Sequence, residues 1–388
     1  MIITGGKILT MAGPVYENGT VEIEKGKIKA VYEGSLREMN ASIIDAHGAW
    51  VMPGLVEAHC HVGIMEEKKG VEGDDCNENV DPVTPCLRAL DAINMMDPAI
   101  ADARRAGITT AMIGPGSSNV VGGQFAIVKL KGRCVDDALV MAPAAMKIAF
   151  GENPKVNYSG MGKSPSTRMA IAGMLRKELF RAKQYMEKRE KAGAEKEWEP
   201  DFTLEPWVPV FEEKIPLKAH VHRVDDIFTA IRIAKEFGLR MTLDHCSEGH
   251  LIADEIKKTG FPAIVGPDLS SRNKIEVQNV AFKTVGELCK AGILTAVTTD
   301  HPVSLLKSLP ICAGLAVKAG LPMEEGLKAI TVNPAKILGI SDRIGTLEIG
   351  KDADIAIFTG NPMEVFTDVL YTIIDGEIVY EKEKDKID

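Results

Sequence analysis

Two patterns of hydrophobic and polar positions occur along the chain, and the first is found at both ends. There, short runs rich in β-branched and aromatic residues are separated by turns such as Asn18-Gly19 and Asp375-Gly376, which is typical of antiparallel strands. Neither terminal stretch is long enough to bury a core alone, so we expect the two to form one small β-domain. The predicted β-rich runs cover residues 1–10, 15–24, 27–33, 345–358, 369–374 and 377–380.

The middle of the chain has a different pattern, in which apolar strand-like runs alternate with amphipathic helical stretches. Such alternation predicts a parallel sheet with crossover helices. A closed barrel needs eight strands, so we place an eighth between residues 120 and 139, where 124–131 is also β-like. The other predicted strands cover residues 55–61, 108–113, 145–150, 217–222, 240–246, 261–265 and 293–300, and the predicted helices cover 98–106, 166–191, 224–237, 251–258 and 284–291.

Together the two patterns predict an α/β protein, a TIM-like (β/α)8 barrel with a small composite β-sandwich domain built from both termini. Residues 1–52 and 341–388 are the expected halves of the sandwich, and residues 53–340 are the expected barrel.

Composition narrows the range of functions. With 45% hydrophobic and 26% charged residues the chain is typical of globular proteins, and a net charge of −9 argues against a nucleic-acid binder. No apolar run approaches the roughly 18 residues of a membrane span. The seven cysteines are scattered and odd in number, which favours reduced thiols over a disulfide framework. We therefore expect a cytoplasmic protein that acts on a small molecule, with no nucleic-acid or membrane partner. Whether the protein forms a homo-oligomer is left open.

Histidine and aspartate residues stand at the predicted C-terminal ends of four barrel strands. His59 and His61 are separated by one residue, so both imidazoles face the same side of their strand. Three later strands end in His220, His245 and Asp300. Barrel active sites form at the C-terminal rim, so these side chains are expected to converge there. Nitrogen and oxygen ligands with open positions fit catalytic zinc or a related divalent metal.

Motifs along the whole chain are similar to those of a known family. The motifs are Val51-Met-Pro-Gly-Leu-Val-Glu-Ala-His-Cys-His61, Lys218-Ala-His-Val-His222, Thr242-Leu-Asp-His245, Thr298-Thr-Asp300, Thr331-Val-Asn-Pro-Ala335 and Gly345-Thr-Leu-Glu-Ile-Gly-Lys-Asp-Ala-Asp354. On these motifs the chain resembles the amidohydrolase superfamily of metal-dependent hydrolases, and within it the imidazolonepropionase-like and dipeptidase-like groups.

The resemblance implies one or two divalent ions, zinc above all, and leaves the bridging ligand open. Many binuclear members use a carbamylated lysine late in the fourth strand, and Lys147 occupies a similar segment. Others use a glutamate, for which Glu152 is the candidate, and a mononuclear site is the third alternative. A buried lysine is costly unless neutralised or modified, which favours Lys147, although its stem could pack while its amine reaches solvent. The implied ligands are His59, His61, Lys147, His220, His245 and Asp300.

The predicted reaction is hydrolysis of a C–N bond in an amide, cyclic amide or small peptide-like substrate, with metal-activated water and Asp300 as general acid and base. Deaminases of this superfamily usually place a glutamate three residues after the fifth-strand histidine, where this chain has Arg223. Deamination of an aminated heterocycle therefore loses ground, although it stays an alternative. N-deacetylation, which would favour Glu152, is another alternative, and a non-catalytic metal-binding protein is the third.

Several further residues are candidates for binding substrate. His222 shares a strand face with His220, and His301 follows Asp300. The glycine-rich segment 117–124 is expected to form a loop after the second barrel strand, where it either holds a substrate carboxylate or only turns the chain. The predicted substrate-binding residues are Glu152, His222, Arg223, His301, Gly123 and Gln124.

Overall fold

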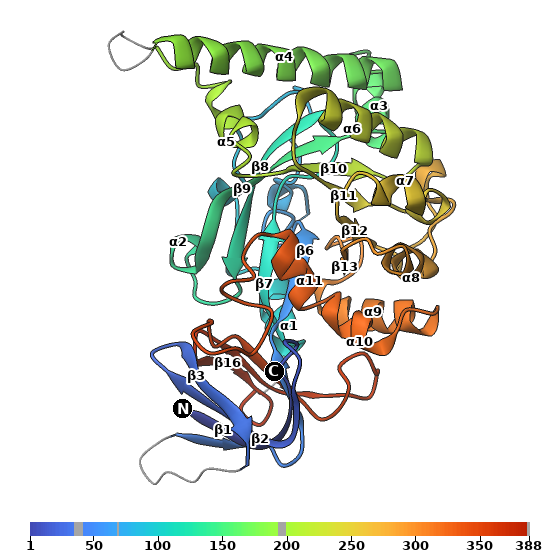
Figure 1. The fold of residues 1–388 in the computed structure, drawn as a ribbon. Coiled ribbons are helices and arrows are strands. Elements are labelled where there is room, and N and C mark those ends of the chain that lie inside the picture. Colours follow the sequence, from blue (N-terminus) through green and yellow to red (C-terminus); the bar gives the residue numbers. More distant parts are fainter. Residues whose placement is uncertain (35–41, 68–69, 193–198, 386–388) are drawn as a thin grey trace.

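The computed structural model describes residues 1–34, 42–67, 70–192 and 199–385. Within these ranges the strands form two separate sheets, each of eight strands. Figure 1 shows the sheet built from the two termini at one end of the molecule, and the sheet from the middle of the chain, with its helices, beyond it. In the described part of the chain, no helix has the length and apolar character needed to cross a bilayer.

The terminal sheet joins both ends of the chain, as predicted. Its strands run in the order β16-β15-β14-β5-β1-β2-β3, while β4 pairs with the first half of β1. Antiparallel pairing of β14 with β5 links the C-terminal half to the N-terminal half. The sheet has its own buried core, which includes Ile3, Ile8, Val51 and Ile355. The strands are β1 (Ile2–Leu9), β2 (Val15–Glu24), β3 (Lys27–Glu33), β4 (Ile43–Asp45), β5 (Trp50–Pro53), β14 (Ile355–Phe358), β15 (Val369–Ile374) and β16 (Glu377–Glu381). The domain boundaries near residues 52 and 340 stay predictions.

The second sheet is the predicted barrel. Its strands follow chain order from β6 to β13, and β13 returns beside β6, where Thr298 Oγ1 donates a hydrogen bond to the carbonyl of His59 (2.6 Å). Every strand expected in the middle of the chain is present. The strands are β6 (Leu55–Cys60), β7 (Ile108–Ile113), β8 (Val121–Lys129), β9 (Leu139–Ala149), β10 (Leu217–Val221), β11 (Met241–His245), β12 (Ala263–Val265) and β13 (Thr295–Val297).

The direction of β8 differs from the prediction. This strand is antiparallel to both β7 and β9, whereas the alternating pattern predicted a fully parallel sheet. A parallel connection needs a crossover of about a dozen residues or more, usually helical. Residues 114–120 and 130–138 are too few for that, and only the short α2 (Val135–Ala138) lies between β8 and β9. Gly123 and Gln124 therefore lie within a strand, not in the loop expected over residues 117–124.

Helices cover the outside of the barrel and confirm the predicted helical segments. The helix α6 begins and ends where the amphipathic pattern predicts, and Gly238 caps it in the left-handed conformation (φ 68°). At the start of α1, Asp97 accepts a hydrogen bond from the Ala99 N–H, and Pro98 occupies the first turn. The remaining bounds are α1 (Pro98–Arg105), α3 (Glu152–Gly160), α4 (Arg168–Ala192), α5 (Val208–Phe211), α6 (Val224–Phe237), α7 (Ala253–Lys257), α8 (Lys283–Lys290), α9 (Leu309–Lys318), α10 (Met323–Lys328) and α11 (Val332–Ile337).

A buried ionic cluster joins the barrel to the terminal sheet. Lys129, the last residue of β8, places its Nζ 2.7 Å from Asp352 Oδ2 and 3.2 Å from Asp354 Oδ1. The same ammonium group also pairs with Asp375. Because β8 runs antiparallel to its neighbours, its C-terminal residue lies at the end of the barrel that faces the terminal sheet.

Candidate metal centre

The structure brings the six predicted ligands to one end of the barrel. His59, Lys147, His220 and His245 lie near the C-terminal ends of β6, β9, β10 and β11. His61 directly follows β6, and Asp300 lies in the segment after β13, which ends at Val297. None of the six is more than 9% exposed. The site is therefore buried at the rim where the strand-end pattern predicts it.

Three of the histidines are oriented by hydrogen bonds from the nitrogen that faces away from the centre. The Nδ1 atoms lie 2.8 Å from Asp244 Oδ2 for His59, 2.7 Å from the Gly114 carbonyl for His61, and 2.8 Å from the Gly266 carbonyl for His245. A carbonyl or carboxylate only accepts, so Nδ1 carries the hydrogen and Nε2 of the neutral ring carries a lone pair. Orientation of this kind is common among metal-binding histidines.

Asp300 lies between the two histidines of β6. Its Oδ1 is 3.1 Å from His61 Nε2 and 3.5 Å from His59 Nε2, so acceptor atoms face one another across a buried space. Such an arrangement requires a proton or a cation between them. Burial lowers the pKa of His61, but the charges of Cys76 and Asp300 outweigh it and raise that pKa to about 10, so without a cation His61 Nε2 carries a proton toward Asp300 and not a lone pair.

The donor set fits a divalent ion. Among the described residues, His220 Nδ1 and His245 Nε2 are buried without a hydrogen-bond partner, and Asp300 Oδ1 faces the imidazole nitrogens of His59 and His61. Buried polar atoms normally have a partner, and imidazole nitrogens with a carboxylate oxygen suit zinc. Two groups each bring their ligand atoms within 4.8 Å of one another: His59 with His245 and Asp300, and His220 with His222 and His245.

Lys147 is fully buried beside His59. Its Nζ lies 3.4 Å from His59 Nε2 and 5.7 Å from the centre of the Phe125 ring. No carboxylate oxygen of the described residues lies within 4.0 Å of this amine, and its side chain does not reach solvent. Burial lowers the pKa of Lys147 to about 8. About a tenth of the amine is therefore neutral at pH 7, far more than for a lysine with its ordinary pKa.

Asp244 was missed by sequence reasoning and is central to the site. It binds His59, and Lys218 Nζ lies 3.1 Å from its Oδ2. In a regular strand Asp244 and His245 would face opposite sides. Here both contact His59, because His245 adopts a left-handed backbone conformation (φ 70°) that turns its ring toward the centre. No periodic pattern in the sequence signals this turn.

Glu276 is the second residue that the sequence did not reveal. It lies in the segment after β12, where its Oε1 is 3.5 Å from His220 Nε2 and 2.6 Å from Lys274 Nζ. Burial raises the pKa of Glu276, but the hydrogen bond with His220 and the charges of His220 and Lys274 keep it below its usual range. Lys274 also donates to Asn153 Oδ1 (2.7 Å). This irregular segment has no periodicity that could have predicted the contact.

Two of the predicted substrate-binding residues lie beside the centre, and a third lies one contact away. His222 packs against His220 with ring centres 4.6 Å apart. His301 is fully buried, and its Nδ1 accepts the Leu306 N–H (3.1 Å), while burial lowers its pKa to about 4. Glu152 is bound to the backbone of Glu276, whose N–H donates to Glu152 Oε2 (3.2 Å).

The other three predicted substrate-binding residues make contacts away from the centre. Arg223 forms two hydrogen bonds with Asp225 at the start of α6. The Gln124 side chain donates to the Pro85 carbonyl (3.0 Å). Gly123 has φ +120°, and a Cβ there would lie 2.4 Å from the Leu87 carbonyl oxygen. Gly123 and Gln124 thus hold the segment around residues 85–87 against β8.

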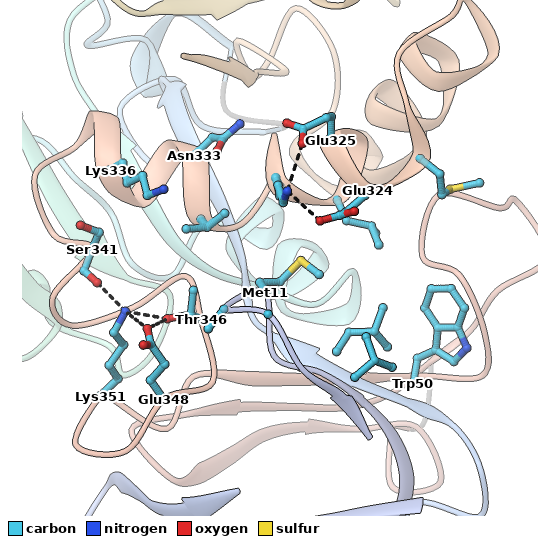
Figure 2. A pocket seen from close by; sticks show the side chains of 18 of the residues that line it. Met11, Trp50, Glu324, Glu325, Asn333, Lys336, Ser341, Thr346, Glu348 and Lys351 are labelled. Atoms are coloured by element: carbon cyan, nitrogen blue, oxygen red, sulfur yellow. Dashed lines mark hydrogen bonds and ion pairs between the residues drawn. The ribbon is translucent and has the colours of Figure 1, made fainter. Parts of the chain in front are cut away.

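A large cavity of about 1140 Å³ lies away from this centre, between the terminal sheet and helices α10 and α11 (Figure 2). It is lined by Met11 and Trp50, and none of the predicted ligands borders it. Three of its lysines pair with carboxylates: Lys7 with Glu17 (2.9 Å), Lys328 with Glu324 (2.7 Å) and Lys351 with Glu348 (2.8 Å). A smaller cavity of about 400 Å³ is lined by Cys76 and Gly122, which lie next to the candidate centre.

Comparisons with known proteins agree with this arrangement. Residues 225–380 match a model described as the amidohydrolase family. A crystal structure of an amidohydrolase from Thermotoga maritima MSB8 is 40% identical, with a TM-score of 0.95 over 98% of this chain and 99% of that one. Amidohydrolase tasK from Hapsidospora irregularis is 27% identical over 92% of this chain, which spans only 39% of the length of that relative. A dihydroorotase from Acetivibrio thermocellus is 24% identical over 98% of both chains.

The relationship to the Thermotoga maritima protein extends over nearly the whole of both chains, with close agreement in fold. The buried histidines and aspartate described above occupy the rim of that shared barrel. The chain belongs to the amidohydrolase family.

Proposed function

We propose that the protein hydrolyses a C–N bond in an amide, a cyclic amide or a small peptide-like substrate, and that it needs a divalent metal to do so. The observation that carries the proposal is the convergence of His59, His61 and Asp300 in a buried space, where Asp300 Oδ1 lies 3.1 Å from His61 Nε2 and 3.5 Å from His59 Nε2. Full-length relatives named dihydroorotase and imidazolonepropionase, both hydrolases of C–N bonds, support the reaction class.

The proposed ligands are those predicted from the strand ends, and zinc is the proposed ion because imidazole dominates the set. A bound divalent ion would supply water activation at neutral pH and polarisation of the substrate carbonyl. The chain itself supplies orientation, through Asp244 and the carbonyls of Gly114 and Gly266. Burial of the site strengthens these electrostatic interactions.

Asp300 is the proposed general base and acid. Although burial raises its pKa, the hydrogen bond and charge of His61 lower it to about 2, so the carboxylate is ionised at neutral pH. An ionised carboxylate can take a proton from the attacking water and deliver it to the departing nitrogen. This transfer leaves the substrate carbonyl as a carboxylic acid and releases an amine.

Lys147 is proposed to carry a carbamate that bridges two ions. Carbamylation joins the neutral amine nitrogen to carbon dioxide and releases one proton. The depressed pKa of Lys147 and the lack of a nearby carboxylate among the described residues support this modification. Protein incubated with ¹³C-bicarbonate should show one carbamate carbon signal by NMR, and Lys147→Arg should lack it. No signal in the metal-loaded wild type would contradict the carbamate.

The test of the reaction combines a substrate panel with one substitution. Metal-loaded protein is screened on N-acyl amino acids, dipeptides, lactams and aminated heterocycles, with amine and ammonia release measured separately. We expect amine or ring-opened product, and Asp300→Asn should lower kcat by at least about 10³-fold while metal content stays near that of the wild type. Turnover retained by Asp300→Asn would defeat the assignment, and ammonia release alone would indicate a deaminase.

A further inference from the structure

We propose that His222 is a third imidazole ligand of the ion held by His220 and His245, in addition to the ligands predicted from the strand ends. The inference rests on the proposed function and deepens it, because it adds a ligand to the second of the two proposed ions.

The first argument is position. His220 and His222 are separated by one residue at the end of β10, which is the same spacing as His59 and His61 at the end of β6. Side chains two residues apart in a strand share a face. Their rings meet edge to face, with centres 4.6 Å apart and an interplanar angle of 76°.

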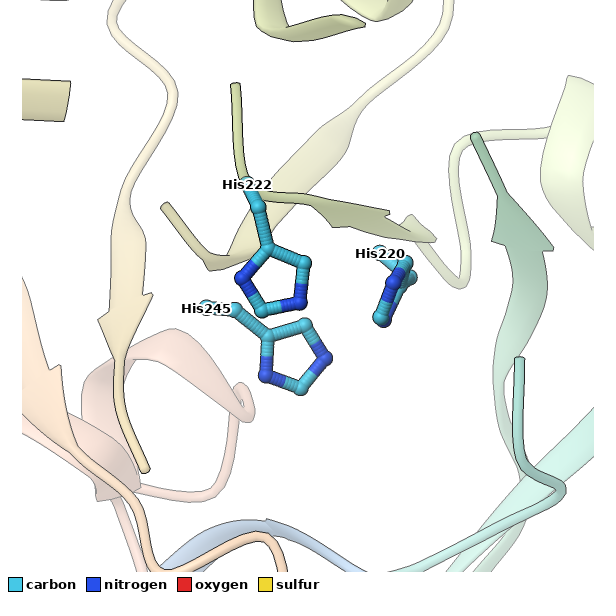
Figure 3. A group of neighbouring side chains, drawn as sticks. All are labelled: His220, His222 and His245. Carbon is cyan, nitrogen blue, oxygen red and sulfur yellow. The ribbon is translucent and has the colours of Figure 1, made fainter. Parts of the chain in front are cut away.

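The second argument is the placement of His245. Its ring stacks on His222, with centres 4.8 Å apart at 10°, and meets His220 edge to face at 4.5 Å. Figure 3 shows one ring nitrogen of His222 and one of His245 directed toward the side on which His220 lies. One nitrogen from each ring lies within 4.8 Å of the others, and all three rings are buried. Zinc–nitrogen bonds of about 2.0–2.1 Å would draw these atoms together.

The third argument is the partners of these nitrogens. His222 Nδ1 is 2.8 Å from Ser247 Oγ, and His245 Nδ1 donates to the Gly266 carbonyl. His245 Nε2 and His220 Nδ1 have no hydrogen-bond partner among the described residues. His222 Nε2 lies 3.9 Å from Glu276 Oε1, which exceeds hydrogen-bond distance. One ion between the rings would satisfy both unpartnered nitrogens and take His222 Nε2 as its third imidazole ligand.

The ligand chemistry of the two sites would differ. The site at His59 and His61 includes the carboxylate oxygen of Asp300, whereas the second site has three imidazoles beside the proposed Lys147 carbamate. Imidazole suits zinc, copper, iron and nickel more than magnesium or calcium. We expect Mg²⁺ not to displace Zn²⁺ from the three-imidazole site.

The experiment counts ions and does not depend on turnover. Chelator-stripped wild type, His222→Gln and the control His47→Gln, whose side chain is 84% exposed in the terminal sheet, are titrated with Co²⁺ and followed by visible absorption and elemental analysis. Wild type and His47→Gln should bind two equivalents per chain. His222→Gln should lose one equivalent, or bind it at least about tenfold more weakly. Circular dichroism of the stripped proteins reports folding.

Each outcome has a separate meaning. Two equivalents bound by His222→Gln with wild-type affinity would overturn this inference and leave the proposed function intact. No Co²⁺ bound by wild type would overturn both. If His222→Gln does not fold, Ser247→Ala keeps the ring and removes the hydrogen bond that orients it. Binding by Ser247→Ala must then weaken for one equivalent, and unchanged binding overturns the inference.

Discussion

At the scale of single residues, the candidate centre depends on what lies behind each imidazole. Asp244 binds three groups: His59 Nδ1 (2.8 Å), Lys218 Nζ (3.1 Å) and Thr242 Oγ1 (2.7 Å). Burial raises the pKa of Asp244, but the charges of Lys218 and His59 hold it below its usual range. The carboxylate therefore orients one proposed ligand and balances a buried ammonium group at the same time.

We predict that Asp244→Asn weakens divalent-ion binding about 10–100-fold, because His59 loses a charged orienting partner. The loss of charge also leaves Lys218 buried without a counter-ion, so stability should fall. Competition with a chromogenic chelator measures the affinity, and Asp342→Asn, at an exposed position, is the control. Ion affinity of Asp244→Asn within twofold of the wild type would show that the contact does not support the centre.

At the scale of elements, the turn from β9 to α3 brings Lys147 and Glu152 to the same rim. Gly151 makes this turn with φ 82° and ψ −137°, a backbone region open almost only to glycine. A Cβ at Gly151 would also lie 2.8 Å from Glu276 Oε2 and 2.9 Å from Asp226 Oδ2. Backbone conformation and close packing thus both require glycine here.

Gly151→Ala should lower the free energy of unfolding by about 1–3 kcal/mol through backbone strain, with displacement of Glu276 as a further cost. Gly160→Ala is a matched control, because Gly160 ends the same helix and a Cβ there has no heavy atom within 4 Å. Urea unfolding of both variants measures the difference. An effect of Gly151→Ala no larger than that of Gly160→Ala would contradict the strain argument.

The elements also show how far pattern analysis reaches. Helix α6 and the strands that carry His59, His220 and His245 lie where periodicity predicts them, because periodicity reports which face of an element is buried. The direction of β8 was predicted wrongly, since an apolar run reads the same in a parallel or antiparallel sheet. Only the short connections on either side of β8 contain that information.

At the scale of the whole molecule, Lys129 connects the barrel to the terminal sheet through Asp352, Asp354 and Asp375. Its side chain is 3% exposed, so the charges compensate one another away from water. The carboxylates lie more than two hundred residues away in sequence from Lys129. The cluster therefore forms only when both parts of the molecule have folded.

Lys129→Met should destabilise the protein by about 3–5 kcal/mol, because it removes one partner and leaves buried carboxylates uncompensated. Lys27→Met removes a lysine that pairs with the same Asp352 from a half-exposed position (52% exposed), and should cost at most about 1 kcal/mol. Thermal or urea unfolding compares the two. Equal losses of stability in the two variants would mean that the buried position of Lys129 adds nothing to the stability of the folded protein.

The same cluster predicts opposite pH dependences for two neighbouring carboxylates. Burial raises the pKa of Asp352, but Lys129 and Lys27 lower it to about 2, so its stabilisation is present above about pH 4 and is lost as the pH falls toward 2. Burial raises the pKa of Asp354 to about 6. Below about pH 4 the group is neutral in both the folded and the unfolded chain and does not reduce stability, whereas the folded protein loses stability as the pH rises through 6.

Urea midpoints measured from pH 2.5 to 8 test both signs. Relative to wild type, Asp352→Asn should flatten the loss of stability below pH 4, and Asp354→Asn should flatten the change between pH 4 and 6. If the pH profiles of both variants run parallel to that of the wild type, these two carboxylates are not the source of the pH dependence of stability.

The sequence by itself determined the strand and helix positions, the pairing of the two termini, and the placement of His59, His61, His220, His245 and Asp300 at strand ends. These are local properties, because backbone periodicity and the buried face of an element follow from nearby residues. The direction of β8 follows from the short connections on either side of it. The tertiary structure decided the inward turn of His245 and the contacts of Asp244 and Glu276. These depend on hydrogen bonds and burial between residues distant in sequence, whose free energies no local pattern contains.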